Sequence, residues 1–247
     1  MPNPQPVTAG QALITPDENR RMFDGISRRY DLLNTIISLG RDRSWRRKAV
    51  DQLHVQRGGI YADAGCGTGA LCMEIARRDQ PGAVTVTGVD FSEAMLREGE
   101  RRVAKRSPTS SITLLRGDAL ALPFPDNALD GVISGFVLRN ISNRPAALQE
   151  WFRVLRPGAS CVVLELAVPE KPVARGLYRL FTRLVVPVAA WFLSRHKAYL
   201  YLLDSIQAFP PSETILALFR QAGFIKAQTT PLTFGAVRIY VGTKPGR

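Results

Sequence analysis

The stretch Asp63–Gly69, with the sequence DAGCGTG, has residue types and spacing that suit binding of a nucleotide-containing ligand. It forms the end of a predicted short strand, GGIYADAG at 58–65, and opens a helical pattern, which predicts a strand, a glycine turn and a helix in succession. Its three glycines allow a tight turn and close approach of the backbone to a ligand. The next predicted strand ends in Asp90, where a carboxylate can accept hydrogen bonds from both hydroxyls of a ribose.

Two cofactors fit this outline, a dinucleotide and S-adenosylmethionine. The dinucleotide pattern is GxGxxG, with a pyrophosphate above the helix N-terminus. Here the spacing is GxGxG, and the preceding Asp63 would repel a pyrophosphate but suits an ammonium group. A third predicted strand ends in GDALALPF, where Asp118 and Ala119 are placed to meet an adenine edge. The set favours S-adenosylmethionine over a purely structural glycine turn, which is the alternative.

Arg139 and Asn140 directly follow the apolar run GVISGFVL at the end of a predicted strand. An unpaired buried charge is costly, so Arg139 is either solvated or faces a polar group in a cleft. Open α/β sheets bind ligands at the carboxyl ends of their strands, where both side chains are expected.

Strands and helices alternate from residue 59, which indicates an α/β domain with a mostly parallel sheet covered on both faces. Predicted strands occupy 58–65, 83–90, 111–118, 129–138, 159–168 and 237–245, and predicted helices occupy 71–79, 92–106, 144–155 and 212–224. Ser92 is the expected N-cap of the second of these helices.

Three segments fall outside this alternation. Residues 1–18 are polar and contain several prolines, which predicts a flexible tail. Residues 19–54 predict helices that form an N-terminal lid, and 169–211 predict a helical insertion. We expect residues 19–247 to form a single domain.

The amino-acid composition limits which binding partners and which cellular compartment we expect for the protein. With 247 residues, 45% of them apolar, the chain is long enough for a full core, and its net charge of +12 favours anionic partners. An odd number of cysteines, two histidines and no CxxC motif predict no disulfide framework, no metal site and a reducing compartment. The N-terminus lacks the apolar region of a signal peptide, and the apolar run 184–193 is too short to span a bilayer.

These motifs together resemble the class I S-adenosylmethionine-dependent methyltransferases and, more narrowly, the ubiquinone/menaquinone biosynthesis C-methyltransferases. The resemblance covers about residues 21–244, and the FxLRN and YxYLxxSIxxFP patterns are specific to that family among methyltransferases. The chain departs from it at Ala70, often aspartate, at Gly135, often serine, and at RHKAYLYL, often DADSYRYL.

The resemblance implies a Rossmann-like class I methyltransferase fold with a seven-stranded sheet. It implies that S-adenosylmethionine is held by residues of the glycine turn, the strand ends and the lid. Tyr30 of the lid has two open interpretations, a contact with the methionine carboxylate or acceptor and a half-buried aromatic with an outward hydroxyl. The expected donor-binding residues are Asp63, Gly65, Gly67, Thr68, Asp90, Asp118, Ala119, Gly135 and Tyr30.

The implied reaction is methyl transfer to a ring carbon of a polyprenylated quinol precursor, with demethylmenaquinol as the expected acceptor. A phenolate carries negative charge on its ortho carbons, so the site must favour the ionised phenol and exclude water. We expect Arg139 to stabilise the phenolate and Asn140 to orient the ring or a water. Guanidinium remains protonated, which makes a water relay a better proton acceptor than Arg139 itself. The alternative is a structural Arg139 that bridges carbonyls or anions.

A polyprenyl tail places the acceptor in a membrane. Residues 171–203 contain six basic and no acidic residues among aromatic and aliphatic ones, which suits an anionic bilayer surface. We therefore expect a cytoplasmic protein bound peripherally to the inner face of the membrane; the alternative is a helical cap packed on the domain. No nucleic-acid-binding module is recognisable, so we expect no nucleic-acid partner. The intact glycine turn argues against a non-catalytic subunit. The sequence leaves open whether the protein forms a homodimer.

Overall fold

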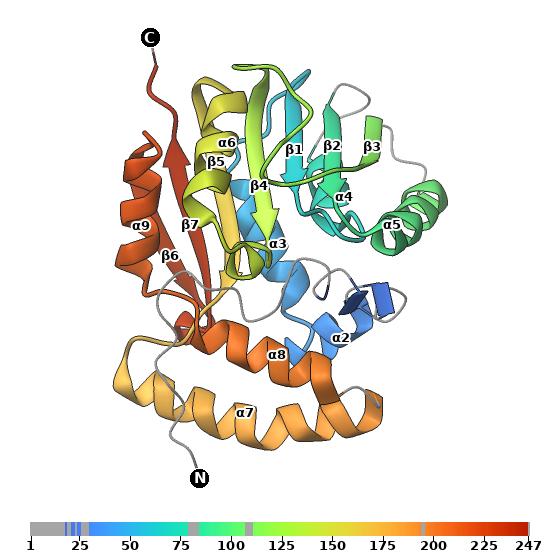
Figure 1. Ribbon diagram of the computed structural model, residues 1–247, viewed down its shortest axis with the longest axis vertical. Coiled ribbons are helices and arrows are strands. Elements are labelled where there is room, and N and C mark those ends of the chain that lie inside the picture. Colours follow the sequence, from blue (N-terminus) through green and yellow to red (C-terminus); the bar gives the residue numbers. More distant parts are fainter. Residues whose placement is uncertain are drawn as a thin grey trace.

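The computed structural model describes residues 18, 21–22, 24–25, 30–78, 84–106, 111–193 and 196–246. In this part of the chain, seven strands form one sheet in the order β3-β2-β1-β4-β5-β7-β6 (Figure 1). Strands β1 to β5 pair in parallel, whereas β7 is antiparallel to β5 and β6. This confirms the expected α/β class and sheet. The strands are β1 (Ile60–Ala64), β2 (Thr85–Asp90), β3 (Ser111–Arg116), β4 (Leu129–Gly135), β5 (Leu155–Leu166), β6 (Ile225–Leu232) and β7 (Val237–Thr243).

Three details differ from the sequence-based prediction. Strand β4 ends at Gly135 rather than at 138, because Phe136 takes a left-handed conformation with φ 64° that breaks the extended backbone. Strand β5 begins at Leu155 and continues through Pro157 and Gly158, where the pairing with β4 has an irregularity. The sequence did not reveal β6, an exposed edge strand that tolerates Pro231.

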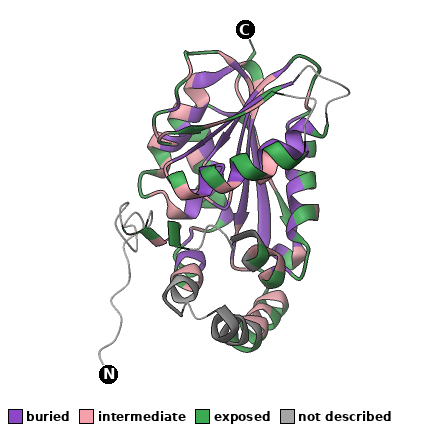
Figure 2. Cartoon of the chain, turned by 90° about the vertical axis from the view of Figure 1, so that its right-hand side faces the viewer, coloured by how far each residue is buried: buried purple, intermediate pink, exposed green. Residues whose placement is uncertain are grey.

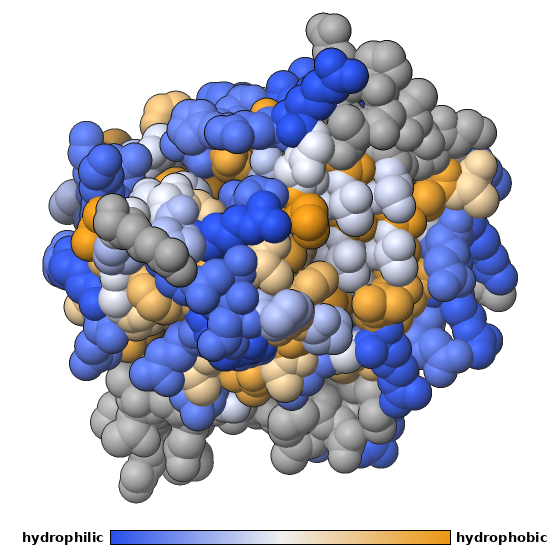
Figure 3. All heavy atoms as spheres, turned by 90° about the horizontal axis from the view of Figure 1, so that it is seen from above, coloured by the Kyte–Doolittle hydropathy of each residue, from blue (hydrophilic) through white to orange (hydrophobic). Residues whose placement is uncertain are grey.

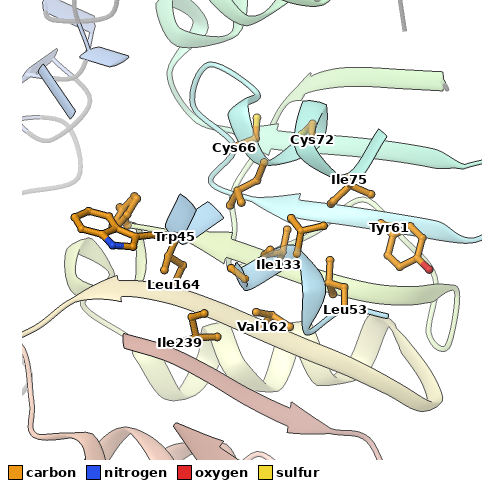
Figure 4. Close-up of a cluster of buried hydrophobic side chains, with 14 of the residues drawn as sticks. Trp45, Leu53, Tyr61, Cys66, Cys72, Ile75, Ile133, Val162, Leu164 and Ile239 are labelled. Carbon is orange, nitrogen blue, oxygen red and sulfur yellow. The ribbon is translucent and has the colours of Figure 1, made fainter. Parts of the chain in front are cut away.

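Helices cover both faces of the sheet and bury an apolar layer on each. One cluster joins α3 and α4 to the sheet (Figure 4), and a second joins α6 and α9 to its other face, with Trp151 fully buried. Figure 2 shows the buried residues concentrated in the sheet and on the inner sides of these helices. Ser92 caps α5 as predicted, since its Oγ accepts from the Met95 N–H at 3.2 Å. These helices are α3 (Asp42–Asp51), α4 (Ala70–Ala76), α5 (Glu93–Arg106), α6 (Arg144–Val154) and α9 (Ser212–Gln221).

The carboxyl ends of the parallel strands point toward a third group of helices, α2 (Tyr30–Ile37), α7 (Pro172–Leu193) and α8 (His196–Gln207) (Figure 1). Helices α7 and α8 come from the predicted insertion and α2 from the predicted lid. The opposite end of the molecule shows mainly hydrophilic residues around smaller hydrophobic patches (Figure 3). Among the described helices, none combines the length and apolarity needed to cross a membrane. Most of the predicted tail lies outside the described residues.

Candidate active site

The glycine turn lies at the carboxyl end of β1, between β2 and β4, where the strand order reverses and open sheets bind ligands. The backbone N–H groups of Gly65 and Cys66 both donate to the Val89 carbonyl, at 2.7 and 3.1 Å. Gly65 has φ 78°, and a Cβ there would stand 2.5 Å from Cγ2 of Val137. Only glycine fits at this position, which brings the turn into direct contact with the loop that follows β4.

Asp90, at the end of β2, organises the turn. Its Oδ2 accepts from the Gly67 N–H and its Oδ1 from the Ser92 N–H, both at 2.8 Å. Burial raises the pKa of this carboxyl, and the two backbone donors oppose the shift. Each oxygen can accept a second hydrogen bond, so the carboxylate retains the capacity to bind ribose hydroxyls. Ser92 also donates its hydroxyl to Asp24 at 2.6 Å, which links this edge to the N-terminal segment.

The predicted adenine loop stands beside Asp90. The Gly117 N–H donates to the Asp90 carbonyl at 3.0 Å. Asp118 is exposed and its Oδ1 accepts from the Leu120 N–H at 2.9 Å, while the buried indole of Trp151 donates to the Ala119 carbonyl at 2.9 Å. These hydrogen bonds hold the loop in place. Gly117 bonds to Asp90, so the following residues Asp118 and Ala119 begin beside the end of β2.

Asp63 is buried at the end of β1, and only one of its oxygens is paired. Its Oδ2 accepts from the Cys72 thiol at 3.4 Å, while Oδ1 has no hydrogen-bond partner among the described residues. Burial raises the pKa of Asp63 to about 7, partly offset by the Cys72 thiol and the nearby charge of Arg46. An unpaired carboxylate oxygen beside a glycine turn fits the ammonium group of S-adenosylmethionine.

The positions of the other three predicted donor-binding residues, Thr68, Gly135 and Tyr30, say less about donor binding. Thr68 is buried within the turn. Gly135 ends β4, and a Cβ there would lie 2.7 Å from Cδ1 of Leu71, so a serine would require Leu71 to move. Tyr30 begins α2, but its side chain lies outside the described residues, and its role stays a prediction.

Arg139 lies in the short helical turn Leu138–Asn140 after β4 and is buried against a carboxylate that the sequence analysis missed. Its Nη1 is 2.7 Å from Oε1 of the fully buried Glu165, and its backbone N–H donates to Oε2 at 3.0 Å. Nη1 also donates to the Phe136 carbonyl. The sequence contained a signal for this contact: a glutamate inside the apolar strand CVVLELAV is expected to be buried, and a buried acid needs a partner.

Asn140 faces helix α8. Its Oδ1 accepts from the Tyr201 hydroxyl at 2.9 Å, and its Nδ2 donates to the Phe136 carbonyl at 3.3 Å. Tyr201 is thus a half-buried partner of Asn140, a contact that the sequence analysis did not identify.

A cavity of about 310 Å³ lies between the sheet end and the helices α2, α3, α7 and α8, a size within the range of ligand pockets. Phe136 and Arg139 form part of its wall. Phe136 is adjacent in the chain to Val137, which contacts the glycine turn, so the cavity and the turn flank the same loop. The other lining residues are mainly apolar and include Ile37, Trp45, Leu166, Leu177, Phe181 and Ile206, with Asp42 and Tyr178 among the polar ones.

Within the described residues, no group of three or more histidine, cysteine, aspartate or glutamate side chains could hold a metal ion. The three cysteines are free and buried. The site is thus formed from buried charges, backbone groups and an apolar cavity.

The family model described as "ubiE/COQ5 methyltransferase family" matches residues 14–244. The chain is 40% identical over 225 residues to the ubiquinone/menaquinone biosynthesis C-methyltransferase UbiE of Geobacter sulfurreducens, covering 91% of this chain and 88% of that protein. It is 38% identical over 231 residues to the demethylmenaquinone methyltransferase of Symbiobacterium thermophilum, covering 91% and 92%.

Solved structures with 15–18% sequence identity share the fold. A SAM-dependent methyltransferase from Aquifex aeolicus matches with a TM-score of 0.60, covering 85% of this chain and 97% of that one. A methyltransferase from Thermotoga maritima, described as a possible histamine N-methyltransferase, matches with a TM-score of 0.61, covering 91% and 98%. These likenesses confirm the class I methyltransferase fold.

We predict that the affinity for S-adenosylmethionine weakens by about tenfold per pH unit below pH 7, because the donor ammonium needs an ionised Asp63 whose pKa is about 7 in the empty protein. Titration calorimetry between pH 5.5 and 8 measures this. Asp63→Asn is the control: it should bind weakly with a much flatter pH dependence, any residual slope reporting Asp90. An equal slope in the variant, or a flat profile in the wild-type protein, would contradict the assignment.

Proposed function

Because the chain belongs to the ubiE/COQ5 methyltransferase family, we propose that this S-adenosylmethionine-dependent quinone C-methyltransferase converts demethylmenaquinol to menaquinol at the inner face of the cytoplasmic membrane. The observation that carries the proposal is the apolar cavity whose wall includes Phe136, next in the chain to the Val137 that contacts the glycine turn. A flat, apolar aromatic ring with a hydroxyl suits its many apolar walls and few polar groups.

The residues of the turn fit the donor. Asp63 has an unpaired oxygen for the ammonium group, Asp90 can accept from the ribose, and Asp118 and Ala119 stand beside it for the adenine. When bound there, S-adenosylmethionine supplies an electrophilic sulfonium methyl group. The chain's task is therefore to hold the acceptor in line with that methyl, to exclude water and to raise the electron density on the ring carbon.

Arg139 is a buried cation on the cavity wall that can stabilise a phenolate. Tyr178 on the wall and Tyr201 beside Asn140 indicate how a phenol ionises here: burial raises the pKa of Tyr178 to about 12 and also raises that of Tyr201, while the charge of Arg139 lowers both. The effect of burial on the pKa is larger than that of Arg139 for both tyrosines, so Arg139 only partly offsets the cost of ionising a phenol there. Glu165 compensates the guanidinium charge and fixes its orientation, and Asn140 and Tyr201 support the same loop.

The acceptor assay tests the proposal. We expect purified protein with methyl-labelled S-adenosylmethionine to label demethylmenaquinol, with the new methyl on a ring carbon and one equivalent of S-adenosylhomocysteine formed per product. The ring proton at that carbon leaves, which restores the aromatic ring. Preferential labelling of a demethylated benzoquinol, or of an unrelated phenol or lipid, would replace the proposed acceptor, and methyl groups found only on oxygen or nitrogen would refute C-methylation.

Arg139→Gln should lower turnover by about 100-fold, because a positioned charge in a dry site makes a contribution of this size. It should also destabilise the protein by about 3–5 kcal/mol, because Glu165 is left buried and uncompensated. The double variant Arg139→Gln/Glu165→Gln separates the two effects: thermal unfolding should return toward the wild-type value while turnover stays low and donor binding stays intact. Near-normal turnover in the double variant would assign Arg139 a purely structural role.

Helix α7 supplies a surface for reversible binding to an anionic bilayer. Val173, Leu177, Leu180 and Leu184 recur at helical spacing with exposed fractions of 79, 61, 55 and 61%. Lys171, Arg179 and Arg183 are exposed on the same helix or next to it. Leu177 also lines the cavity, together with Leu39 and Phe234, which are 69 and 84% exposed. These residues support a mouth that faces the membrane and admits a headgroup whose tail stays in the lipid.

Vesicle flotation tests this surface. We expect the protein to float with vesicles that contain phosphatidylglycerol, to stay behind with neutral vesicles, and to be released by salt. The variant Val173→Ser/Leu180→Ser/Leu184→Ser and the variant Arg179→Gln/Arg183→Gln should each float less, whereas the matched control Arg97→Gln/Arg101→Gln on α5 should float normally. Wild-type protein that ignores anionic vesicles, or equal losses in the control, would rule out α7 as the contact.

A further inference from the structure

Two buried side chains of opposite charge each leave one polar atom without a hydrogen-bond partner among the described residues. They are Asp63 at the end of β1, through Oδ1, and Arg46 on α3, through Nη2. Arg46 is 9% exposed and Asp63 is 1% exposed. Unsatisfied charged atoms at such burial are costly, so two at one place indicate a missing ligand.

The two side chains are near each other without forming a pair. The charge of Arg46 lowers the pKa of Asp63, which places the guanidinium within electrostatic reach of the carboxylate. The only ion pair that Arg46 makes with a described residue is a long one, from Nε to Oδ2 of Asp42 at 3.8 Å. The guanidinium carbon stands 5.5 Å from the centre of the Phe136 ring, so a cation–π contact holds it over the loop after β4.

Arg46 stands outside the acceptor cavity. Its helix neighbours Asp42 and Trp45 line the acceptor cavity, as does Phe136, but Arg46 does not. An arginine that served the phenol would have to reach the cavity wall, where Arg139 already stands. Arg46 is instead within electrostatic reach of the end of β1, where Asp63 keeps an open oxygen.

We propose that Arg46 binds the carboxylate of the amino-acid part of S-adenosylmethionine while Asp63 binds its ammonium group. A zwitterion satisfies both open atoms at once, and a guanidinium matches a carboxylate in shape and charge. Through its contact with Phe136, the bound arginine also fixes the donor against the loop that forms the cavity wall. The inference rests on the proposed donor site and assigns it a further positioning residue.

Ligand analogues separate this role from a merely structural one. Titration calorimetry compares S-adenosylmethionine with its decarboxylated form and with 5′-methylthioadenosine, which lacks the whole amino-acid group. Arg46→Met should weaken binding of S-adenosylmethionine by about 10- to 100-fold, the size expected for a charged hydrogen bond, and leave the other two ligands within about twofold of wild type. Arg46→Lys should recover part of the loss, and the exposed neighbour Arg47→Met serves as the matched control.

The outcomes are distinct. A loss confined to the carboxylate-containing ligand, with partial recovery by lysine, supports the proposal. Equal losses for all three ligands, or no loss, overturn it and leave Arg46 as a residue that only packs on Phe136. No binding of S-adenosylmethionine to the wild-type protein would overturn the donor site itself, and failure of the acceptor assay with donor binding intact would overturn only the proposed acceptor.

Discussion

The contact between Gly65 and Val137 is the constraint on which the site depends. With a Cβ at position 65 only 2.5 Å from the valine side chain, the turn after β1 and the loop after β4 can touch only because the first is glycine. Since β1 and β4 are neighbours at the point where the strand order reverses, this contact places the glycine turn beside Phe136. Phe136 in turn faces the apolar cavity. A donor at the turn and an acceptor in the cavity would therefore meet beside one loop, where in-line transfer requires the ring carbon, the methyl group and the sulfur to be aligned.

The buried charges around this loop are of two kinds. The Arg139–Glu165 pair is compensated within the protein, with a separation of 2.7 Å and backbone donors to both carboxylate oxygens, so it holds the loop in one arrangement. Asp63 and Arg46 keep open atoms, and burial leaves the pKa of Asp63 near 7. The Arg139–Glu165 pair provides rigidity, whereas Asp63 and Arg46 keep polar atoms that the proposed donor would satisfy.

Sequence reasoning predicted which segments lie together where the signal is local, although the binding roles of their residues stay predictions. The glycine turn, Asp90 and the Asp118–Ala119 loop each belong to a strand end, and parallel pairing brings such ends together without further information. It failed where long-range packing decides. Glu165 lies 26 residues from Arg139, and Tyr201 lies 61 residues from Asn140. Hydrophobic periodicity relates only residues within one helix or strand, so it cannot predict contacts over such separations. Strand β6 was not predicted because an exposed edge strand has no apolar run. The cavity was not predicted either, because it depends on how α2, α7 and α8 pack.

The most direct test of this arrangement is a crystal structure with S-adenosylhomocysteine and an unmethylated quinol analogue bound together. We expect the ribose at Asp90, the amino-acid group at Asp63, and the sulfur beside Phe136, directed at a ring carbon inside the cavity with no protein atoms between them. A ring bound outside the cavity, or a sulfur directed away from Phe136, would contradict the arrangement.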